Sequence, residues 1–586
     1  MLGPVGPAAR AGRPVQRHPR AAISQRTLRV IVPFVLFLAG AVLGAQAPRT
    51  TAPEPFSVVE ASITDMRAAL EQGRTSSHDI VQQYLTRIAA YEDLVNSTIS
   101  INPHALDEAD ALDRERRQGQ VRGPLHGIPV ALKDNIQTTH MPTTGGALVF
   151  AGQVPPYEAT LTKHLRDGGA IIIAKTVMTE LANWVAAAMP GGYSTVGGHS
   201  FNPYAVSRDP LERRGAGRPV LSPGGSSSGT GTAANLWAAN VGTETSGSIL
   251  NPASLTMLAA IKPTVGRISR HGVIPITADQ DTAGPMARSV ADAAILLGAL
   301  EGTAPDPNDP ATRRCPPPPN GDYTRFLQPD ALKGARIGIP RAYFYSSIEL
   351  PGTAASEGGL SGAHELVMGE AIAALRAQGA VIVDPADIPS ITTPEAAKNL
   401  LSWPECSGSY DVRGRDEACS IVFKYGMKRD FTTWLASLGA AAPVRSLAEL
   451  RAWNRAHAGA IAYGQAQLDI SDQMDVARDR ARYEADRARD VSLGGAEGID
   501  AALRAHQLDA LLFPGSSGAN LAARPGYPTV IVPFGAMSNT TSNTTPNVSP
   551  PLGVAFTGTA CSEPRLIALA YAFEQATKRR VPPKLD

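Results

Sequence analysis

The chain has 586 residues, of which 43% are hydrophobic and 18% are charged, and its formal net charge is +1. This composition excludes a disordered tail, a collagen and a coiled coil, and it allows a large buried core. The 55 glycines and 48 prolines indicate many turns and shaped loops, as in a large enzyme built from loops. No long basic run lies outside the N-terminus, so we expect no nucleic-acid partner.

The first 47 residues differ in charge from the rest of the chain. They contain six arginines and no acidic residue, and the apolar run 30–43 follows the arginines. The run ends at Ala45-Gln46-Ala47, a small-x-small cleavage motif. This order predicts an export signal over 1–47, with a periplasmic or extracellular protein. The alternative is a retained membrane anchor at 30–43; otherwise we expect no stable membrane partner.

Helix and strand patterns alternate after a proline-containing linker at 48–55, which predicts one domain over 56–586. Ser76 and Asp79 form a capping box before an apolar row at helical spacing. Strands are predicted at 169–174, 380–383, 511–513, 530–532 and 554–556, helices at 364–378 and 562–578, and long loops at 205–222 and 538–550. The alternation predicts an α/β fold, a single large domain with a mixed central β-sheet covered by helices on both faces.

Four cysteines are present, and no C-x-x-C motif joins any of them. The pattern therefore gives little support to a zinc or redox site. In an exported chain an even number of cysteines permits disulfides. Cys406 and Cys419 enclose a short polar loop and are the best pair, and free or buried thiols are the alternative.

A lysine ends the first of three stretches that could carry chemistry, 127–135. Lys133 follows an apolar strand, and burial there would lower its pKa and make it a usable base near neutral pH. The alternative is a surface lysine whose stem covers apolar neighbours. Lys175, at the end of the apolar run 171–174, has the same local pattern.

The second stretch, 222–230, places glycines and three hydroxyls before a predicted helix at 233–237. It lacks the lysine of a phosphate-binding P-loop. It also matches a G-x-S-x-G elbow, but Pro223-Gly224 argues against the strand that such an elbow requires.

The third stretch, 242–248, contains small residues that leave successive backbone N–H groups free to point into a cleft. An oxyanion hole requires such groups, and Ser248 follows them as a possible nucleophile. A tight polar turn is the alternative for this stretch taken alone.

Together the three stretches resemble the amidase signature family, serine hydrolases with a Ser–cis-Ser–Lys triad, and among its branches the bacterial peptide amidases. The matching motifs are 127–135, 223–229 and 242–248, and similarity continues through 261–267, 269–276, 280–292, 526–556 and 571–577. The resemblance therefore extends over nearly all of the predicted domain.

The resemblance implies that Ser248 is the nucleophile, that Ser226 lies behind a cis peptide and bridges to the base, and that Lys133 is that base. It implies an oxyanion hole made by the backbone amides of Thr245, Ser246, Gly247 and Ser248. The implied activity is hydrolysis of a small-molecule or peptide amide through an acyl-serine intermediate. We expect no cofactor and no metal, and a monomer or homodimer.

Three features depart from the family pattern. Ser226 and Ser248 lie 22 positions apart, fewer than is usual, which predicts a shortened helix between them and leaves Ser227 as the alternative bridging serine. Ser246 stands where glycine or aspartate is common, and Leu250 stands where many members have arginine. Substrate specificity is expected from loops 184–222, 340–360 and 400–440, which match the family least.

Other functions fit the sequence less well. A non-catalytic binding protein on the same fold need not keep all three triad residues, and export would separate a tRNA-dependent amidotransferase A-type subunit from cytoplasmic tRNA. None of the 11 histidines stands in a recognisable Ser–His–Asp motif. A zinc protease is excluded because Met368 replaces the second histidine after His364-Glu365.

Overall fold

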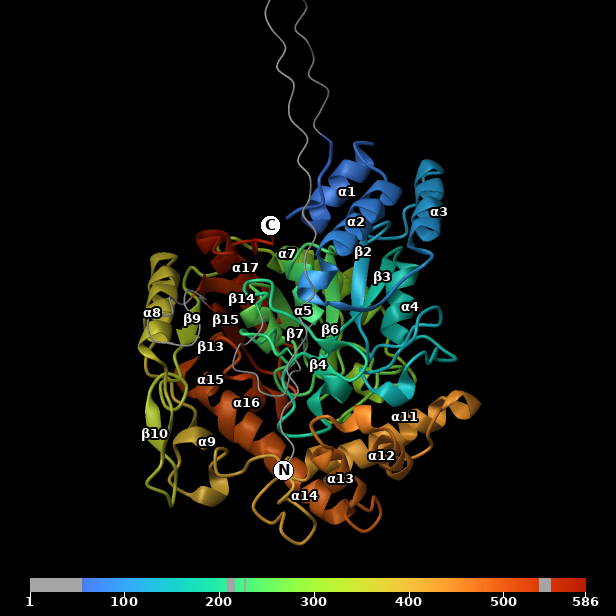
Figure 1. The fold of residues 1–586 in the computed structure, drawn as a ribbon. Coiled ribbons are helices and arrows are strands. Elements are labelled where there is room, and N and C mark those ends of the chain that lie inside the picture. Colours follow the sequence, from blue (N-terminus) through green and yellow to red (C-terminus); the bar gives the residue numbers. More distant parts are fainter. Residues whose placement is uncertain (1–54, 208–216, 226–227, 537–549, 586) are drawn as a thin grey trace, which may run out of the picture. The chain divides into compact units, whose positions relative to one another are not determined.

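The computed structural model describes residues 55–207, 217–225, 228–536 and 550–585. The residues from Pro55 onward form one compact unit, built around an eleven-stranded sheet (Figure 1). In spatial order the strands are β1 (Thr98–Ile101), β3 (Ile171–Thr176), β2 (Pro129–Lys133), β6 (Ala239–Glu244), β8 (Thr282–Ala287), β7 (Ala259–Lys262), β14 (Thr529–Ala536), β15 (Pro551–Thr557), β13 (Ala510–Pro514), β9 (Arg336–Gly338) and β12 (Val381–Val383).

The sheet is mixed, as predicted. β2 runs parallel to both β3 and β6, whereas β8 is antiparallel to β6 and β7. The second half joins through the antiparallel pair β7–β14, and β9 is parallel to β13 and β12. The strands predicted at 169–174, 380–383, 511–513, 530–532 and 554–556 correspond to β3, β12, β13, β14 and β15.

Helices flank this sheet in two groups. α7 (Val290–Glu301) and α17 (Glu563–Thr577) pack on each other and on the sheet, and so do the short helices α5 (Ser228–Ala233) and α6 (Leu250–Leu255). The other α-helices of eight residues or more among the described residues are α1 (Ile63–Glu71), α2 (Ser77–Val95), α3 (Ala105–Arg117), α4 (Thr160–Asp167), α8 (Gly362–Ala377), α12 (Leu447–Ala456) and α14 (Arg480–Val491). The predicted α/β class is confirmed. None of the helices in the described ranges is long and apolar enough to cross a membrane.

The predicted capping box begins α2. The Ser76 hydroxyl accepts from the Asp79 amide at 3.0 Å, and the Asp79 carboxylate accepts from the Ser76 amide at 3.2 Å. Each contact gives a partner to a group at the helix N-terminus that has none within the helix.

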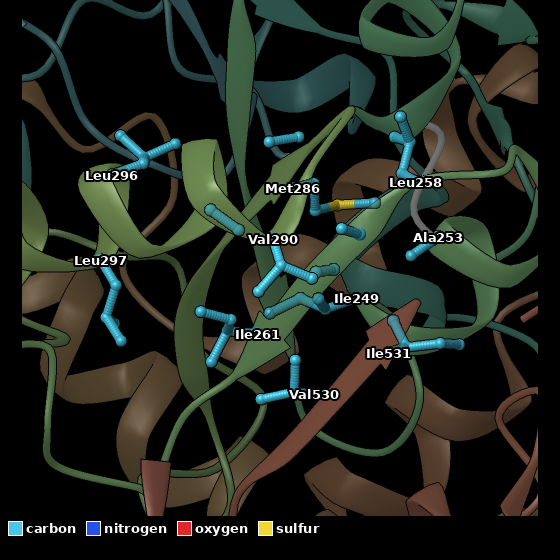
Figure 2. Packing of buried hydrophobic residues seen from close by; sticks show 14 of the residues in the cluster. Ile249, Ala253, Leu258, Ile261, Met286, Val290, Leu296, Leu297, Val530 and Ile531 are labelled. Carbon is cyan, nitrogen blue, oxygen red and sulfur yellow. The ribbon is translucent and has the colours of Figure 1, made fainter. Parts of the chain in front are cut away.

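Apolar side chains fill the space around the strands in the middle of the sheet (Figure 2). Ile249, Ile261, Met286, Val290 and Ile531 are each fully buried there. Burying one such side chain stabilises the fold by about 1.5–3 kcal/mol. Because Ile249 directly follows Ser248, this packing also fixes the main chain beside the candidate nucleophile.

The helix predicted at 233–237 is wrong. Helix α5 lies earlier and ends at Ala233, and Asn235 takes a left-handed φ of 58°. Trp237 turns back onto the helix, where a Cβ added to Gly231 would lie 2.1 Å from the indole ring. The apolar run after α5 therefore leads into β6 instead of extending the helix.

All four cysteines lie in the described ranges and form two disulfides. Cys406 is bonded to Cys419, the pair expected from the sequence, and Cys315 is bonded to Cys561. The second bond joins positions 246 residues apart, which no local pattern could indicate. Positions 538–549 of the predicted loop, and 208–216 of the loop at 205–222, lie outside the described residues.

Candidate active site

Lys133 is the last residue of β2 and is fully buried. The parallel pairing of β2 with β6 brings its ammonium group to the adjacent strand, where Nζ donates to the Thr243 carbonyl at 3.1 Å. The surface alternative for this lysine is therefore wrong. The stretch 127–135 therefore contacts the stretch 242–248.

Burial lowers the pKa of Lys133 to about 7, because the charged ammonium loses its hydration. The negative charges of Asp281 and Glu244 oppose this effect and favour the ammonium. At neutral pH a substantial fraction of Lys133 is thus the neutral amine, which can accept a proton.

Lys175 is also fully buried, so its resemblance to Lys133 extends to the structure. Its Nζ lies 3.2 Å from Asp134 Oδ1 and donates to the Thr143 hydroxyl at 2.7 Å. The two lysines differ in their partners, because Lys175 is bound to a carboxylate and Lys133 to a neutral carbonyl. Sequence reasoning missed this ion pair.

The turn 245–248 connects the end of β6 to helix α6. Gly247 has a φ of 97°, in the left-handed region that glycine tolerates best. The buried Glu244 carboxylate accepts from the amides of Ile249 at 2.8 Å and Leu250 at 3.0 Å. Glu244 therefore joins the end of β6 to the start of α6 through these hydrogen bonds. They fix the turn that contains Ser248.

The backbone N–H groups of this turn have no hydrogen-bond partner within the described part of the chain. Among the hydrogen bonds between described residues, none is donated by the main-chain nitrogens of Thr245, Ser246, Gly247 or Ser248. Four adjacent unpaired N–H groups can stabilise an oxygen that becomes negatively charged. The oxyanion hole that the resemblance implies at 245–248 stays a prediction.

Asp281 holds the side chain of Thr245, the first residue of the turn. Its carboxylate accepts from the Thr245 hydroxyl and, at 2.9 Å and 3.0 Å, from the amides of Ile276 and Thr277. Burial raises the pKa of Asp281 to about 7. The sequence showed Asp281 only as part of a family-like stretch, without a role.

A cavity of about 230 Å³ adjoins Asp281. Its wall includes the stacked rings of Tyr157 and His271, with centroids 5.0 Å apart, together with Asp430 and Trp434. The last two residues belong to the stretch 400–440, from which specificity was expected. This stretch therefore lines a space next to the candidate site.

Ser248 is half-buried, and the serine-rich stretch reaches it. A Cβ added to Gly225 would lie 3.5 Å from the Ser248 hydroxyl oxygen. Ser226 and Ser227, the two candidates for the bridging serine, lie outside the described residues. The structure thus brings Lys133, the turn 245–248 and the start of the serine-rich stretch into one region.

Comparison with known proteins agrees with this geometry. The family model named Amidase matches residues 79–566. The chain belongs to the amidase family. The predicted family, fold class and amide-hydrolase activity are confirmed.

Relatives and solved structures support this assignment. A protein from Arabidopsis thaliana that is named as an amidase is 34% identical over 538 residues, which cover 90% of this chain and 92% of that protein. The peptide amidase of Stenotrophomonas maltophilia is 38% identical with a TM-score of 0.75, covering 91% of this chain and 100% of that one. The A-type subunit of the glutamyl-tRNA(Gln) amidotransferase from Chloroflexus aurantiacus is 37% identical, but the match covers only 55% of this chain and 60% of that protein.

Proposed function

We propose that this amidase is an exported serine hydrolase that cleaves carboxamides, with C-terminal peptide amides as the first substrate class to test. The observation that carries the proposal is the contact between Lys133 and Thr243. It brings a buried lysine with a lowered pKa to the strand that leads directly into Ser248. The name and fold of the peptide amidase relative support the choice of substrate class.

In the proposed reaction the Ser248 oxygen forms a bond to the carbonyl carbon of the amide. Its proton passes through the hydroxyl of Ser226 to the neutral amine of Lys133. The N–H groups of the turn 245–248 stabilise the resulting oxyanion. The C–N bond then breaks, and the leaving nitrogen takes the proton back from Lys133. Water cleaves the acyl-serine ester by the same route, which releases the acid and restores Ser248.

Two features support export. The arginine-rich segment, the apolar run 30–43 and the cleavage motif follow one another as in export signals. Both disulfides require an oxidising compartment to persist. The periplasm or the extracellular space provides such conditions.

Ammonia release from a panel of amides tests the proposed chemistry. The panel contains peptide amides, fatty-acid amides, aryl amides and short aliphatic amides, and Ser248→Ala is the matched variant. We expect turnover of peptide amides by the parent and none by Ser248→Ala. Turnover confined to another class would overturn the substrate proposal, and turnover by Ser248→Ala would overturn the nucleophile.

A further inference from the structure

Gly225, the residue directly before Ser226, is held by side chains on both sides. The Thr179 hydroxyl donates to the Gly225 carbonyl at 2.6 Å. The Gly225 amide donates to Asn251 Oδ1 at 3.3 Å. Both polar groups of this glycine are therefore fixed by side chains from distant parts of the sequence.

The Thr179 hydroxyl both donates and accepts a hydrogen bond. While it donates to Gly225, its oxygen accepts from the Gly192 amide at 2.8 Å, and the side chain is fully buried. Valine has the same shape but can form neither hydrogen bond. Serine can form both.

The neighbouring backbone is closely packed against helix α6. Gly224 has a φ of 95°, and a Cβ added there would lie 2.5 Å from the Cα of Pro252. Asn251, on the same helix, is held in turn by donation from Nδ2 to the Ser516 hydroxyl at 3.2 Å. Helix α6 thus supports the serine-rich stretch and also begins two residues after Ser248.

The segment that follows Thr179 has an unusual backbone. Leu181, Ala182 and Asn183 have φ values of 42°, 56° and 73°. Three successive non-glycine residues in the left-handed region are strained, and such strain persists where the surrounding structure enforces it. The surrounding structure therefore holds the backbone at 181–183, two residues after Thr179.

We propose that Thr179 is a positioning residue of the amidase, which acts through Ser226. Its hydroxyl orients the carbonyl of Gly225, and that carbonyl belongs to the peptide bond that includes the nitrogen of Ser226. Asn251 holds the opposite side of Gly225 against Ser248. The inference rests on the proposed function, because it assumes that Ser226 transfers the proton.

The experiment measures how fast a fluorescent fluorophosphonate labels Ser248 in the full-length protein. The probe needs no known substrate, because Ser248 attacks phosphorus, fluoride leaves and the serine proton passes to the base. Thr179→Val is compared with Thr179→Ser and with Thr176→Val. Thr176 is a suitable control, because it is also buried and its hydroxyl has no hydrogen-bond partner among the described residues.

We expect Thr179→Val to slow labelling by roughly 10- to 100-fold, since small misplacements of reacting groups can cost about that much. Thr179→Ser should stay within roughly threefold of the parent, as should Thr176→Val, because neither loses a hydrogen bond of this network. If Thr179→Val does not fold, Asn251→Ala tests the other side of Gly225 and should slow labelling in the same way. A normal rate in a folded Thr179→Val protein overturns the inference.

A double-mutant cycle with Ser226→Ala separates positioning from a general loss of structure. If Thr179 acts through Ser226, Thr179→Val should slow labelling no further once Ser226 is alanine. An equal slowing in both backgrounds overturns the inference and leaves the proposed function intact. If Ser226→Ala itself labels at the parental rate, the bridging role of Ser226 fails, and the inference fails with it.

Discussion

Lys175 Nζ lies 3.2 Å from Asp134 Oδ1, and Asp134 is the residue that directly follows Lys133. Both side chains of this ion pair are fully buried. The pair therefore fixes the main chain next to the proposed base. Lys175 and Lys133 have different roles, since Lys175 binds a carboxylate and Lys133 accepts a proton in the proposed reaction.

Lys175→Ala should destabilise the protein. Removing one member of a buried ion pair leaves the other charge without a partner, which typically costs about 3–5 kcal/mol. Thermal and urea unfolding measure the loss. Lys163→Ala is the control, because the Lys163 side chain is 67% exposed. Unchanged unfolding of Lys175→Ala would show that the ion pair contributes nothing to stability.

Lys133→Met should abolish turnover and stabilise the fold at neutral pH. The folded-state pKa of Lys133, about 7, lies below its ordinary 10.5. Between these values the unfolded chain binds more protons than the folded one, so parental stability rises with pH. Removing the lysine removes a penalty on the order of a few kcal/mol at pH 7.

Unfolding of parent and Lys133→Met from pH 7 to 10.5 measures this effect. The two unfolding free energies should converge as pH rises. Parental turnover should increase with pH through about 7, as Lys133 becomes the neutral amine. A parental activity that falls over this range would exclude Lys133 as the base.

Asp281→Asn should move the rise in activity to lower pH. The Asp281 carboxylate favours the ammonium form of Lys133 and so raises the pKa of that lysine. Without the negative charge, Lys133 loses its proton at lower pH. The pH–rate profile of the variant checks the direction. Thr245→Ser, which keeps the hydroxyl bonded to Asp281, should leave the profile unchanged.

Cys406→Ser and Cys561→Ser should each destabilise the protein. In the chain-entropy model the loss is about 3 kcal/mol for the short loop closed by Cys406–Cys419 and about 5.5 kcal/mol for the long loop closed by Cys315–Cys561. Mass mapping without reductant should find both cross-linked peptides. Free thiols in the mature protein would contradict this pairing.

The mature protein should begin at Pro48, because the cleavage motif ends at Ala47. N-terminal sequencing after expression in an exporting bacterial host checks this directly. A chain that still begins at Met1 and sediments with membranes would instead support the retained anchor.

Local patterns predicted much of the fold but only part of the site. The apolar runs in the sequence correctly predicted the positions of β3, β13 and β15, because a buried strand can be recognised from its own apolar residues. The sequence also correctly predicted that Lys133 ends a strand. The Lys175–Asp134 pair and the contact between Thr179 and Gly225 join residues 41 and 46 positions apart, and no periodicity encodes such partners. The error at 233–237 has a local cause, because helix α5 ends at Ala233 and Trp237 packs back on Gly231.

The antiparallel pair β7–β14 has a consequence for how the chain is made. Strand β7 ends at Lys262, but its partner β14 begins only at Thr529. During synthesis the half of the sheet from β1 to β7 in spatial order is complete at Ala287, and the edge of β7 then stays unpaired until β14 has been made. Open strand edges of this kind are prone to aggregation. The proposed export would avoid this hazard if the chain crossed the membrane unfolded and then folded as a whole.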